Sequence, residues 1–284
     1  MERKPEWLKV RLNTSEKFSG LQKLVRDKKL NTVCVEAACP NIYECWNAGT
    51  ATFMILGDTC TRSCGFCNVK TGRSEWVDPE EPLRVAESVR TLGLKHAVIT
   101  SVNRDELLNG GAEIFAQTIR EIRRLNPECA VELLVPDFKG SVEALEIVMR
   151  EKPDILAHNT ETVPRLYATA RPQANYEQTL DVIRRIHGYG LVSKSGVMLG
   201  LGETADEVRA VMRDLQAHGC QILTLGQYLQ PTRENLPVAR FVHPDEFAAL
   251  REEGLAMGFD HVESGPLVRS SYHAERQATA LPRR

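Results

Sequence analysis

The sequence predicts an α/β protein whose fold is a partial (β/α)6, TIM-like barrel with an extension at each end. Short apolar runs alternate with amphipathic stretches from residue 51 onward, which indicates strands and helices in turn. Six such pairs in series favour a parallel sheet with helices outside it. A doubly wound parallel sheet stays as the alternative, because periodicity alone does not separate the two architectures.

The elements follow from these patterns in order along the chain. Residues 1–50 hold too little apolar sequence for a core, and two short helices are expected there, at Phe18–Arg26 and Ile42–Ala48. Strands are predicted at Thr52–Gly57, His96–Val102, Val131–Val135, Ile155–His158, Ser193–Leu199 and Ile222–Tyr228. Helices are predicted at Pro82–Thr91, Ala112–Leu125, Ser141–Arg150, Tyr176–His187, Ala205–His218 and Pro244–Met257. We therefore divide the chain into an N-terminal extension (1–50), a barrel (51–260) and a C-terminal tail (261–284).

Composition is typical of a globular protein, with 42% hydrophobic and 26% charged residues among 284. A net charge of −2 does not indicate a nucleic-acid partner. The first 30 residues carry nine Lys or Arg against four Asp or Glu, which favours a solvated face over a landing surface for an acidic partner. There is no run of about 18 apolar residues and no secretory signal, so we expect a reducing cytoplasm and no membrane.

Six of the eight cysteines fall between residues 34 and 67, in two triplets. Cys34, Cys39 and Cys45 are spaced C-x4-C-x5-C, and Cys60, Cys64 and Cys67 are spaced C-x3-C-x2-C. In a reducing compartment clustered cysteines indicate metal binding rather than disulfides. A structural zinc site usually has four ligands, whereas three thiolates suit a cubane iron–sulfur cluster with one iron free of cysteine. An iron–sulfur cluster is therefore favoured over zinc at each triplet.

The segment Cys60-Thr-Arg-Ser-Cys64-Gly-Phe66-Cys67 resembles the radical S-adenosylmethionine motif, with Phe66 at its aromatic place. In that superfamily the open iron binds S-adenosylmethionine, whose reductive cleavage gives a radical that removes hydrogen from unactivated carbon. Cys60 follows the first predicted strand, so its cluster is expected at the carboxyl ends of the strands, where βα folds place their ligand sites.

Further segments resemble the lipoyl synthase family. The first triplet, in CVEAACPNIYEC, resembles the family's auxiliary-cluster motif, and Arg269-Ser270-Ser271-Tyr272 resembles its terminal signature. Thr100–Asp105 and Glu203 also resemble family segments, and the resemblance spans residues 5–275. It implies a second [4Fe-4S] cluster held by Cys34, Cys39, Cys45 and a serine, assigned to Ser271 with Ser270 second.

The resemblance also implies the reaction, which is insertion of two sulfur atoms at C6 and C8 of an octanoyl chain attached to a lysine of a lipoyl carrier domain. Two S-adenosylmethionine molecules would be used, and the auxiliary cluster would supply the sulfur. The implied partners are octanoylated carrier domains, an electron donor such as ferredoxin or flavodoxin, and an iron–sulfur carrier that rebuilds the cluster. Serine is a harder ligand than thiolate and suits release of the auxiliary cluster.

Seven polar residues are candidates for binding S-adenosylmethionine, because carboxylates suit its amine or ribose and cations suit its carboxylate. Thr100, Ser101, Asn159 and Glu161 lie at the expected carboxyl ends of the second and fourth strands, and Arg171, Lys194 and Gln227 are further candidates that would point inward. His158 is interpreted as a core histidine, and Cys129 and Cys220 as buried apolar residues. Gly200-Leu-Gly202-Glu-Thr-Ala205 matches a dinucleotide fingerprint, but no acidic residue ends the next predicted strand, so we do not assign it that function.

Two rival hypotheses remain open from sequence. The first is another radical enzyme, such as a methylthiotransferase or a biotin-synthase-like sulfur inserter. The former would add an RNA-binding module, and the latter lacks the first triplet. The second is a non-catalytic zinc or iron–sulfur module, which iron and sulfide analysis would distinguish from an enzyme.

Overall fold

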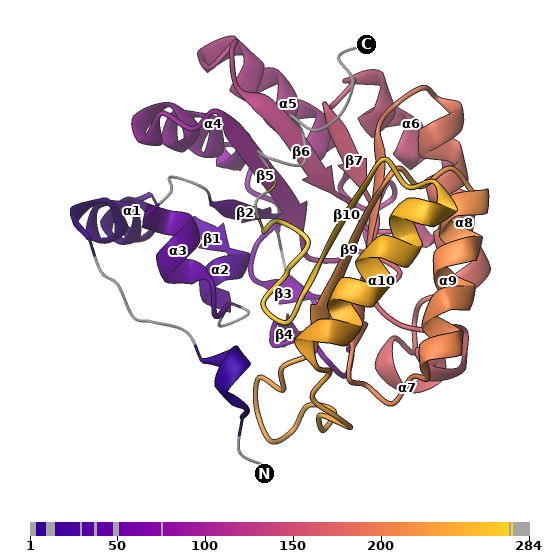
Figure 1. Cartoon of the computed structure of the whole chain (residues 1–284). Helices are drawn as coiled ribbons and strands as arrows, with labels where there is room; N and C mark the ends of the chain where they lie inside the picture. The colour runs from indigo at the N-terminus through magenta and orange to yellow at the C-terminus, as the bar shows by residue number, and fades with distance from the viewer. Residues whose placement is uncertain are drawn as a thin grey trace. The chain divides into compact units, whose positions relative to one another are not determined.

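A computed structural model of the chain describes residues 4–9, 15–28, 30–36, 39–47, 51–74, 76–272 and 274 (Figure 1). The chain forms two compact units. The first unit comprises residues 12–62 and 68–156, and the second comprises residues 1–11, 63–67 and 157–284. Among the described residues, no helix combines the length and apolar character needed to cross a membrane.

The first unit is built on parallel strands with helices packed in series. Its strands are β1 (Asn31–Thr32), β2 (Thr52–Ile55), β5 (His96–Ser101) and β6 (Ala130–Leu134), in that order across the sheet, with β3 (Thr59–Cys60) and β4 (Lys70–Thr71) as a separate pair. Its helices are α1 (Glu16–Asp27), α2 (Val33–Glu36), α3 (Ile42–Asn47), α4 (Glu81–Leu92), α5 (Ala112–Leu125) and α6 (Val142–Arg150). β2, β5 and β6 pair in parallel, and β1 joins β2 antiparallel. In Figure 1, α4, α5 and α6 follow one another along these strands.

Burial explains why the helices form where they do. In α5 the buried apolar residues Ala112, Phe115, Ala116, Ile119 and Ile122 follow the three- and four-residue spacing of one helix face. The strands β2 and β5 are buried along almost their whole length, as expected for parallel strands covered by helices.

The second unit repeats this alternation. The strand β7 (Ile155–Ala157) lies where the chain passes from the first unit to the second. It is followed by β8 (Ser193–Leu199), β9 (Ile222–Gln227) and β10 (His261–Gly265), which pair in parallel in that order. The helices of this unit are α7 (Tyr167–Ala170), α8 (Tyr176–Gly188), α9 (Ala205–Ala217) and α10 (Pro244–Met257). It also contains the 3-10 turns η1 (Glu6–Leu8) and η3 (Pro164–Leu166). The remaining 3-10 turn, η2 (Phe138–Gly140), belongs to the first unit. α10 packs along β10 and β9, and α9 lies beside it (Figure 1).

The predicted α/β class with parallel strands is confirmed. All six predicted strands and all six predicted barrel helices are present, with ends that differ by a few residues. The two expected N-terminal helices occur as α1 and α3, although Ala48 lies outside the described residues. Four of the described strands were not predicted. β1, β3 and β4 have only two residues each, and β10 (sequence HVESG) has one fully buried residue, so none of them shows a recognisable apolar run.

Candidate functional site

Cys60 lies at the end of β3 in the first unit, and backbone groups surround its sulfur. The N–H groups of Asn103 and Arg62 donate to Cys60 Sγ at 3.3 and 3.4 Å. The loop that follows β5 also fixes Thr61, whose N–H donates to the carbonyl of Asn103 at 3.0 Å. Hydrogen bonds to sulfur are one means by which proteins tune iron–sulfur clusters. The site of Cys60 is therefore suited to a cluster ligand.

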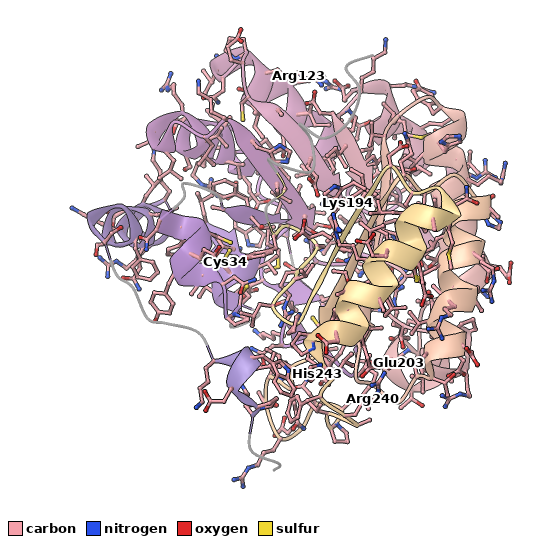
Figure 2. The ribbon with its side chains drawn as sticks, in the orientation of Figure 1. Cys34, Arg123, Lys194, Glu203, Arg240 and His243 are labelled. Atoms are coloured by element: carbon pink, nitrogen blue, oxygen red, sulfur yellow. The ribbon has the colours of Figure 1, made fainter. Side chains whose placement is uncertain are left out.

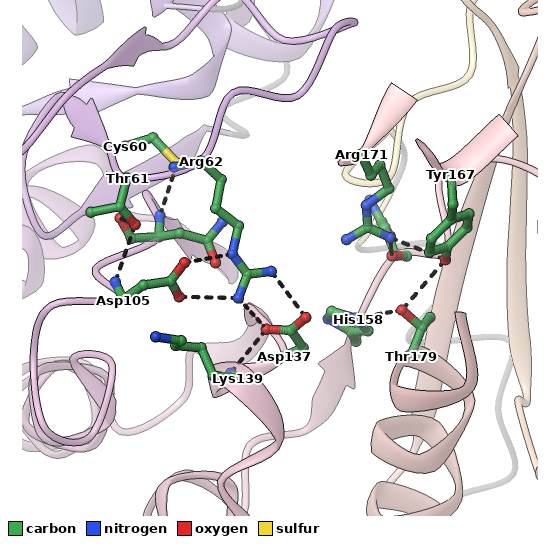
Figure 3. A network of polar contacts seen from close by, with 12 residues as sticks. Cys60, Thr61, Arg62, Asp105, Asp137, Lys139, His158, Tyr167, Arg171 and Thr179 are labelled. Carbon is green, nitrogen blue, oxygen red and sulfur yellow. Dashed lines mark hydrogen bonds and ion pairs between the residues drawn. The ribbon is translucent and has the colours of Figure 1, made fainter. Parts of the chain in front are cut away.

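Arg62 anchors the loop after Cys60 through two carboxylates (Figure 3). Its guanidinium donates to Asp105 at 2.7 and 3.0 Å and to Asp137 at 2.9 and 2.6 Å. Burial alone would lower the pKa of Arg62, but the hydrogen bonds that it donates to Asp137 and Asp105 outweigh this effect and raise the pKa. Sequence reasoning missed this group. Its one local signal is an arginine between two motif cysteines, since its partners lie 43 and 75 residues away.

The rest of the cysteine motif, residues 63–67, is held by backbone contacts in the second unit. The N–H of Gly65 donates to the carbonyl of Ala170 at 2.9 Å, and the Gly65 carbonyl accepts from the N–H of Leu236 at 2.9 Å. A Cβ at Gly65 would lie 2.9 Å from Leu236 Cγ, so this position requires glycine for close packing. The amide of Asn235 donates to the carbonyl of Cys67 at 2.9 Å. Two segments distant in sequence thus set the backbone around Cys64 and Cys67.

The first cysteine triplet belongs to the first unit, with two of its members on two short helices. Cys34 is on α2 and Cys45 on α3, and the N–H of Cys39 donates to the carbonyl of Cys34 at 3.1 Å (Figure 2 labels Cys34). Burial raises the pKa of the Cys34 thiol, and the neighbouring Cys39 raises it further. The backbone hydrogen bond therefore holds these two residues of the triplet next to each other.

Across the described ranges, no three His, Cys, Asp or Glu side chains lie close enough together to hold a metal ion. The grouping of each triplet around a cluster therefore stays a prediction.

Asn159, Glu161 and Arg171 come together after β7 in the second unit (Figure 3 shows Arg171). The Asn159 amide donates to the Glu161 carboxylate at 3.0 Å, and Arg171 donates to the carbonyls of Asn159 and Thr160 at 2.8 and 2.9 Å. Burial raises the pKa of Glu161, and Arg171 and Asn159 oppose this in part. Glu161 has a φ of 68°, a left-handed conformation that non-glycine residues rarely adopt. Its N–H donates to the Gly196 carbonyl, and its carbonyl accepts from Met198, both at 2.8 Å.

Two buried polar atoms in each unit, on candidate residues or near them in sequence, have no hydrogen-bond partner among the described residues. They are Asn159 Oδ1 and Arg171 Nε in the second unit, and Ser101 Oγ and Asn103 Oδ1 in the first. Buried polar atoms are normally paired, so such orphans commonly mark a ligand site. Three of these four residues belong to the predicted S-adenosylmethionine set, which means that the residues fit a polar ligand.

The other candidates for binding S-adenosylmethionine are buried or make hydrogen bonds within the protein. Thr100 Oγ1 donates to the carbonyl of Leu134 at 2.9 Å. Gln227 is buried, and its amide nitrogen donates at 3.0 Å to the carbonyls of Leu199, Tyr228 and Arg240, while its oxygen accepts from Val242. Lys194 is fully buried in β8 (Figure 2). Gln227 therefore has a visible structural role, which is to hold the loop that leads into α10.

Three expectations outside the cysteine motifs are confirmed. His158 is a buried histidine whose Nε2 lies 3.3 Å from Thr179 Oγ1. Cys129 and Cys220 are buried, and burial raises the pKa of their thiols to about 11 and about 12. Both thiols therefore stay protonated at neutral pH.

The glycine-rich loop after β8 binds its own glutamate. The Glu203 carboxylate accepts the N–H groups of Gly200 and Leu201 at 2.6 and 2.9 Å. A dinucleotide fingerprint would offer its N–H groups to a pyrophosphate. Because Glu203 occupies these donors, the loop does not support dinucleotide binding.

Ser270 and Ser271 follow β10 in a turn that the structure describes up to Tyr272. Both serines are partly exposed, and the N–H of Tyr272 donates to the carbonyl of Arg269 at 2.9 Å. The two serines are neighbours in the same turn. The assignment of Ser271 rather than Ser270 as the iron ligand therefore stays a prediction.

Comparison with known proteins gives one family. A profile described as the Radical SAM superfamily matches residues 54–215. A lipoyl synthase of Rubrobacter xylanophilus is 57% identical over 276 residues, which cover 96% of this chain and 86% of that protein. A lipoyl synthase of Chlorobaculum parvum is 54% identical over 275 residues, covering 96% and 94%.

The solved structures agree at the level of fold. The crystal structure of methylornithine synthase superposes with a TM-score of 0.55 at 14% identity, covering 88% of this chain and 79% of that one. Its resemblance supports the partial-barrel class that the strand–helix alternation predicts. From the profile and the full-length identities together, the chain belongs to the Radical SAM superfamily and, within it, to the lipoyl synthases.

Proposed function

We propose that this enzyme inserts two sulfur atoms at C6 and C8 of an octanoyl chain carried on a lysine of a lipoyl carrier domain. The observation that carries the proposal is the 57% identity to a lipoyl synthase over 96% of the chain, which includes both cysteine triplets and the terminal serines. The carbons concerned are neither acidic nor activated, so general-base catalysis does not serve them.

Cys60, Cys64 and Cys67 are the proposed ligands of the cluster that binds S-adenosylmethionine. When bound there, S-adenosylmethionine and the reduced cluster supply a radical able to remove hydrogen from unactivated carbon. The residues of the chain position these groups. The N–H donors of Arg62 and Asn103 hold Cys60 Sγ, and the unpaired atoms of Ser101, Asn159 and Arg171 are available to the polar parts of S-adenosylmethionine. One molecule would be used for each of the two hydrogens removed.

Cys34, Cys39, Cys45 and Ser271 are the proposed ligands of an auxiliary [4Fe-4S] cluster that supplies the sulfur. Three thiolates and one harder oxygen ligand fit a cluster that must later be given up. The proposed partners follow from this chemistry: octanoylated carrier domains as substrate, a ferredoxin- or flavodoxin-like electron donor, and an iron–sulfur carrier that restores the cluster. All require a reducing compartment such as the cytoplasm.

The test is anaerobic incubation of the reconstituted chain with an octanoyl-lysine peptide, S-adenosylmethionine and a reductant, read by mass spectrometry. We expect about eight irons per chain, as two four-iron clusters require, and a product with two added sulfurs. Cys64→Ala should abolish both S-adenosylmethionine cleavage and sulfur insertion. Cys39→Ala should keep the cleavage and lose the insertion, because it affects only the first triplet.

Cys129→Ala is the matched control. This thiol is buried and lies far from both triplets in the sequence, so the variant should keep both activities. A wild-type chain that cleaves S-adenosylmethionine but adds no sulfur would contradict the proposal. So would a chain that binds one or two zinc ions in place of iron.

A further inference from the structure

The segment that carries the terminal serines packs on a strand rather than extending into solvent. We call residues 267–272 the serine segment. The N–H of Val268 donates to the carbonyl of Gly265 at 3.1 Å, so the chain turns back directly after β10. Val268 is buried, at 5% exposure, although it lies only a few residues from the last described position. The start of the serine segment is therefore part of the packed second unit.

The surface on which Val268 packs is provided by Gly226 in β9. A Cβ placed on Gly226 would lie 2.1 Å from the carbonyl oxygen of Val268 and 3.0 Å from its carbonyl carbon. Both are backbone atoms, so no side-chain rotation could relieve the overlap. The backbone conformation of Gly226 is not left-handed, which means that the missing side chain, and not backbone freedom, is what this position requires.

The same face of the sheet carries a residue of the candidate S-adenosylmethionine site. Thr224 and Gly226 are two positions apart in β9 and so face the same side. Gly196 pairs with Thr224, and a Cβ on Gly196 would lie 2.6 Å from Thr224 Oγ1 and 3.1 Å from Asn159 Oδ1. Asn159 Oδ1 is one of the buried atoms with no described partner. The serine segment therefore begins over the face on which Asn159 lies.

We propose that Gly226 is a positioning residue for the terminal serines. By leaving room for the Val268 carbonyl, it fixes where the serine segment leaves β10 and keeps Ser270 and Ser271 near the carboxyl end of β9. This segment would offer the serine ligand that the proposed function assigns to the auxiliary cluster. The inference about the cluster rests on the proposed function, whereas the inference about the path of the segment does not.

The experiment compares Gly226→Ala with the unaltered chain. The added methyl group must displace the Val268 backbone, because close-packed interiors do not absorb such an overlap. Amide exchange over residues 267–272, followed by mass spectrometry on the apo-protein, should become about tenfold faster. Gly188→Ala is the control, since no atom lies within 4 Å of the added Cβ, and it should leave exchange in this segment unchanged.

The consequence for the cluster is measured in chains that also carry Cys60→Ala, Cys64→Ala and Cys67→Ala, so that only the first triplet can hold iron. A chelator should remove iron from the Gly226→Ala chain about tenfold faster, the change expected when a ligand is displaced by an overlap of this kind. Ser271→Ala should have a similar effect. The double variant Gly226→Ala/Ser271→Ala should be no worse than Ser271→Ala alone, because both changes would act through one ligand.

The exchange experiment tests the position of the serine segment, and the iron-release experiment tests whether this segment binds the cluster. Unchanged exchange in Gly226→Ala would overturn the positioning role. Faster exchange with unchanged iron release would show that the serine segment binds no iron, which is a failure of the proposed function and not of the packing. If Gly226→Ala does not fold, Val268→Ala replaces it, since it shortens the buried anchor without an overlap. Faster exchange in that variant would support the packing of the serine segment at Val268, and unchanged exchange would overturn it.

Discussion

At the scale of single residues, Arg62 determines how the loop after Cys60 is held. A bidentate arginine is planar and directional, so two such contacts with Asp105 and Asp137 leave the guanidinium little freedom. Arg62 and Asp137 are buried, whereas many other arginine–carboxylate pairs among the described residues have an exposed arginine. Buried pairs are costly to break because they leave a charge without a partner.

We predict that Asp137→Asn destabilises the fold far more than the loss of a surface ion pair does. The expected decrease in the free energy of unfolding is about 3 kcal/mol, measured by chemical denaturation of the apo-protein. Glu151→Gln, which removes the partner of the exposed Arg120, is the control and should cost about 0.5 kcal/mol. Equal losses in the two variants would show that the Arg62 contacts do not secure the loop.

At the scale of elements, the sequence predicts what is local and misses what is distant. Apolar runs and helical periodicity place six strands and six helices, and the cysteine spacing identifies the motif loop. The contact of Arg62 with Asp137 spans 75 residues, and that of Gly226 with Val268 depends on the absence of a side chain. Neither contact produces a repeating pattern in the sequence, so both become visible only in the folded structure.

The turn after β2 shows a further element that sequence did not predict. Leu56 and Gly57 have positive φ values, 69° and 91°, and the buried Glu81 at the start of α4 accepts the N–H of Leu56 at 2.7 Å. Burial raises the pKa of Glu81 above its usual value of 4.5, and the N–H groups of Leu56 and Gly57 oppose this in part. A side chain at the start of α4 therefore stabilises the turn that leads toward Cys60.

We predict that Glu81 makes the apo-protein less stable as the pH rises. Its folded-state pKa lies above the unfolded value, so the folded chain binds the proton more tightly. The free energy of unfolding should therefore fall as the pH rises from below 4.5 through the raised pKa. Glu81→Gln stays neutral and should flatten this fall, as measured by urea unfolding from about pH 4 to about pH 7. Glu143→Gln, on the exposed part of α6, should leave the slope unchanged, and a slope equal in all three proteins would contradict the prediction.

At the scale of the whole molecule, each unit presents buried polar atoms without described partners near the carboxyl ends of its parallel strands. Ser101 and Asn103 do so in the first unit, and Asn159 and Arg171 in the second. This is where βα folds bind their ligands, because the loops that follow the strands converge there. The chain belongs to the Radical SAM superfamily, and we propose that these atoms contact S-adenosylmethionine.

We predict that Ser101→Ala weakens binding of S-adenosylmethionine by the anaerobic, cluster-loaded enzyme about tenfold, the loss of one buried hydrogen bond. Isothermal titration calorimetry measures the affinity directly. Ser88→Ala removes an equally buried hydroxyl group, one that donates to the carbonyl of Arg84 within α4, and should leave the affinity unchanged. Identical affinities for wild type and Ser101→Ala would remove Ser101 from the binding site.

The most direct test of the account is to follow the sulfur atoms themselves. The chain is reconstituted with iron and heavy-isotope sulfide, freed of excess sulfide, and given the octanoyl-lysine peptide, S-adenosylmethionine and a reductant in the presence of light sulfide. If the first cysteine triplet holds a cluster that is consumed, both sulfurs in the product are heavy and each chain turns over about once. Light sulfur in the product would show that the sulfur does not come from a cluster held by the chain.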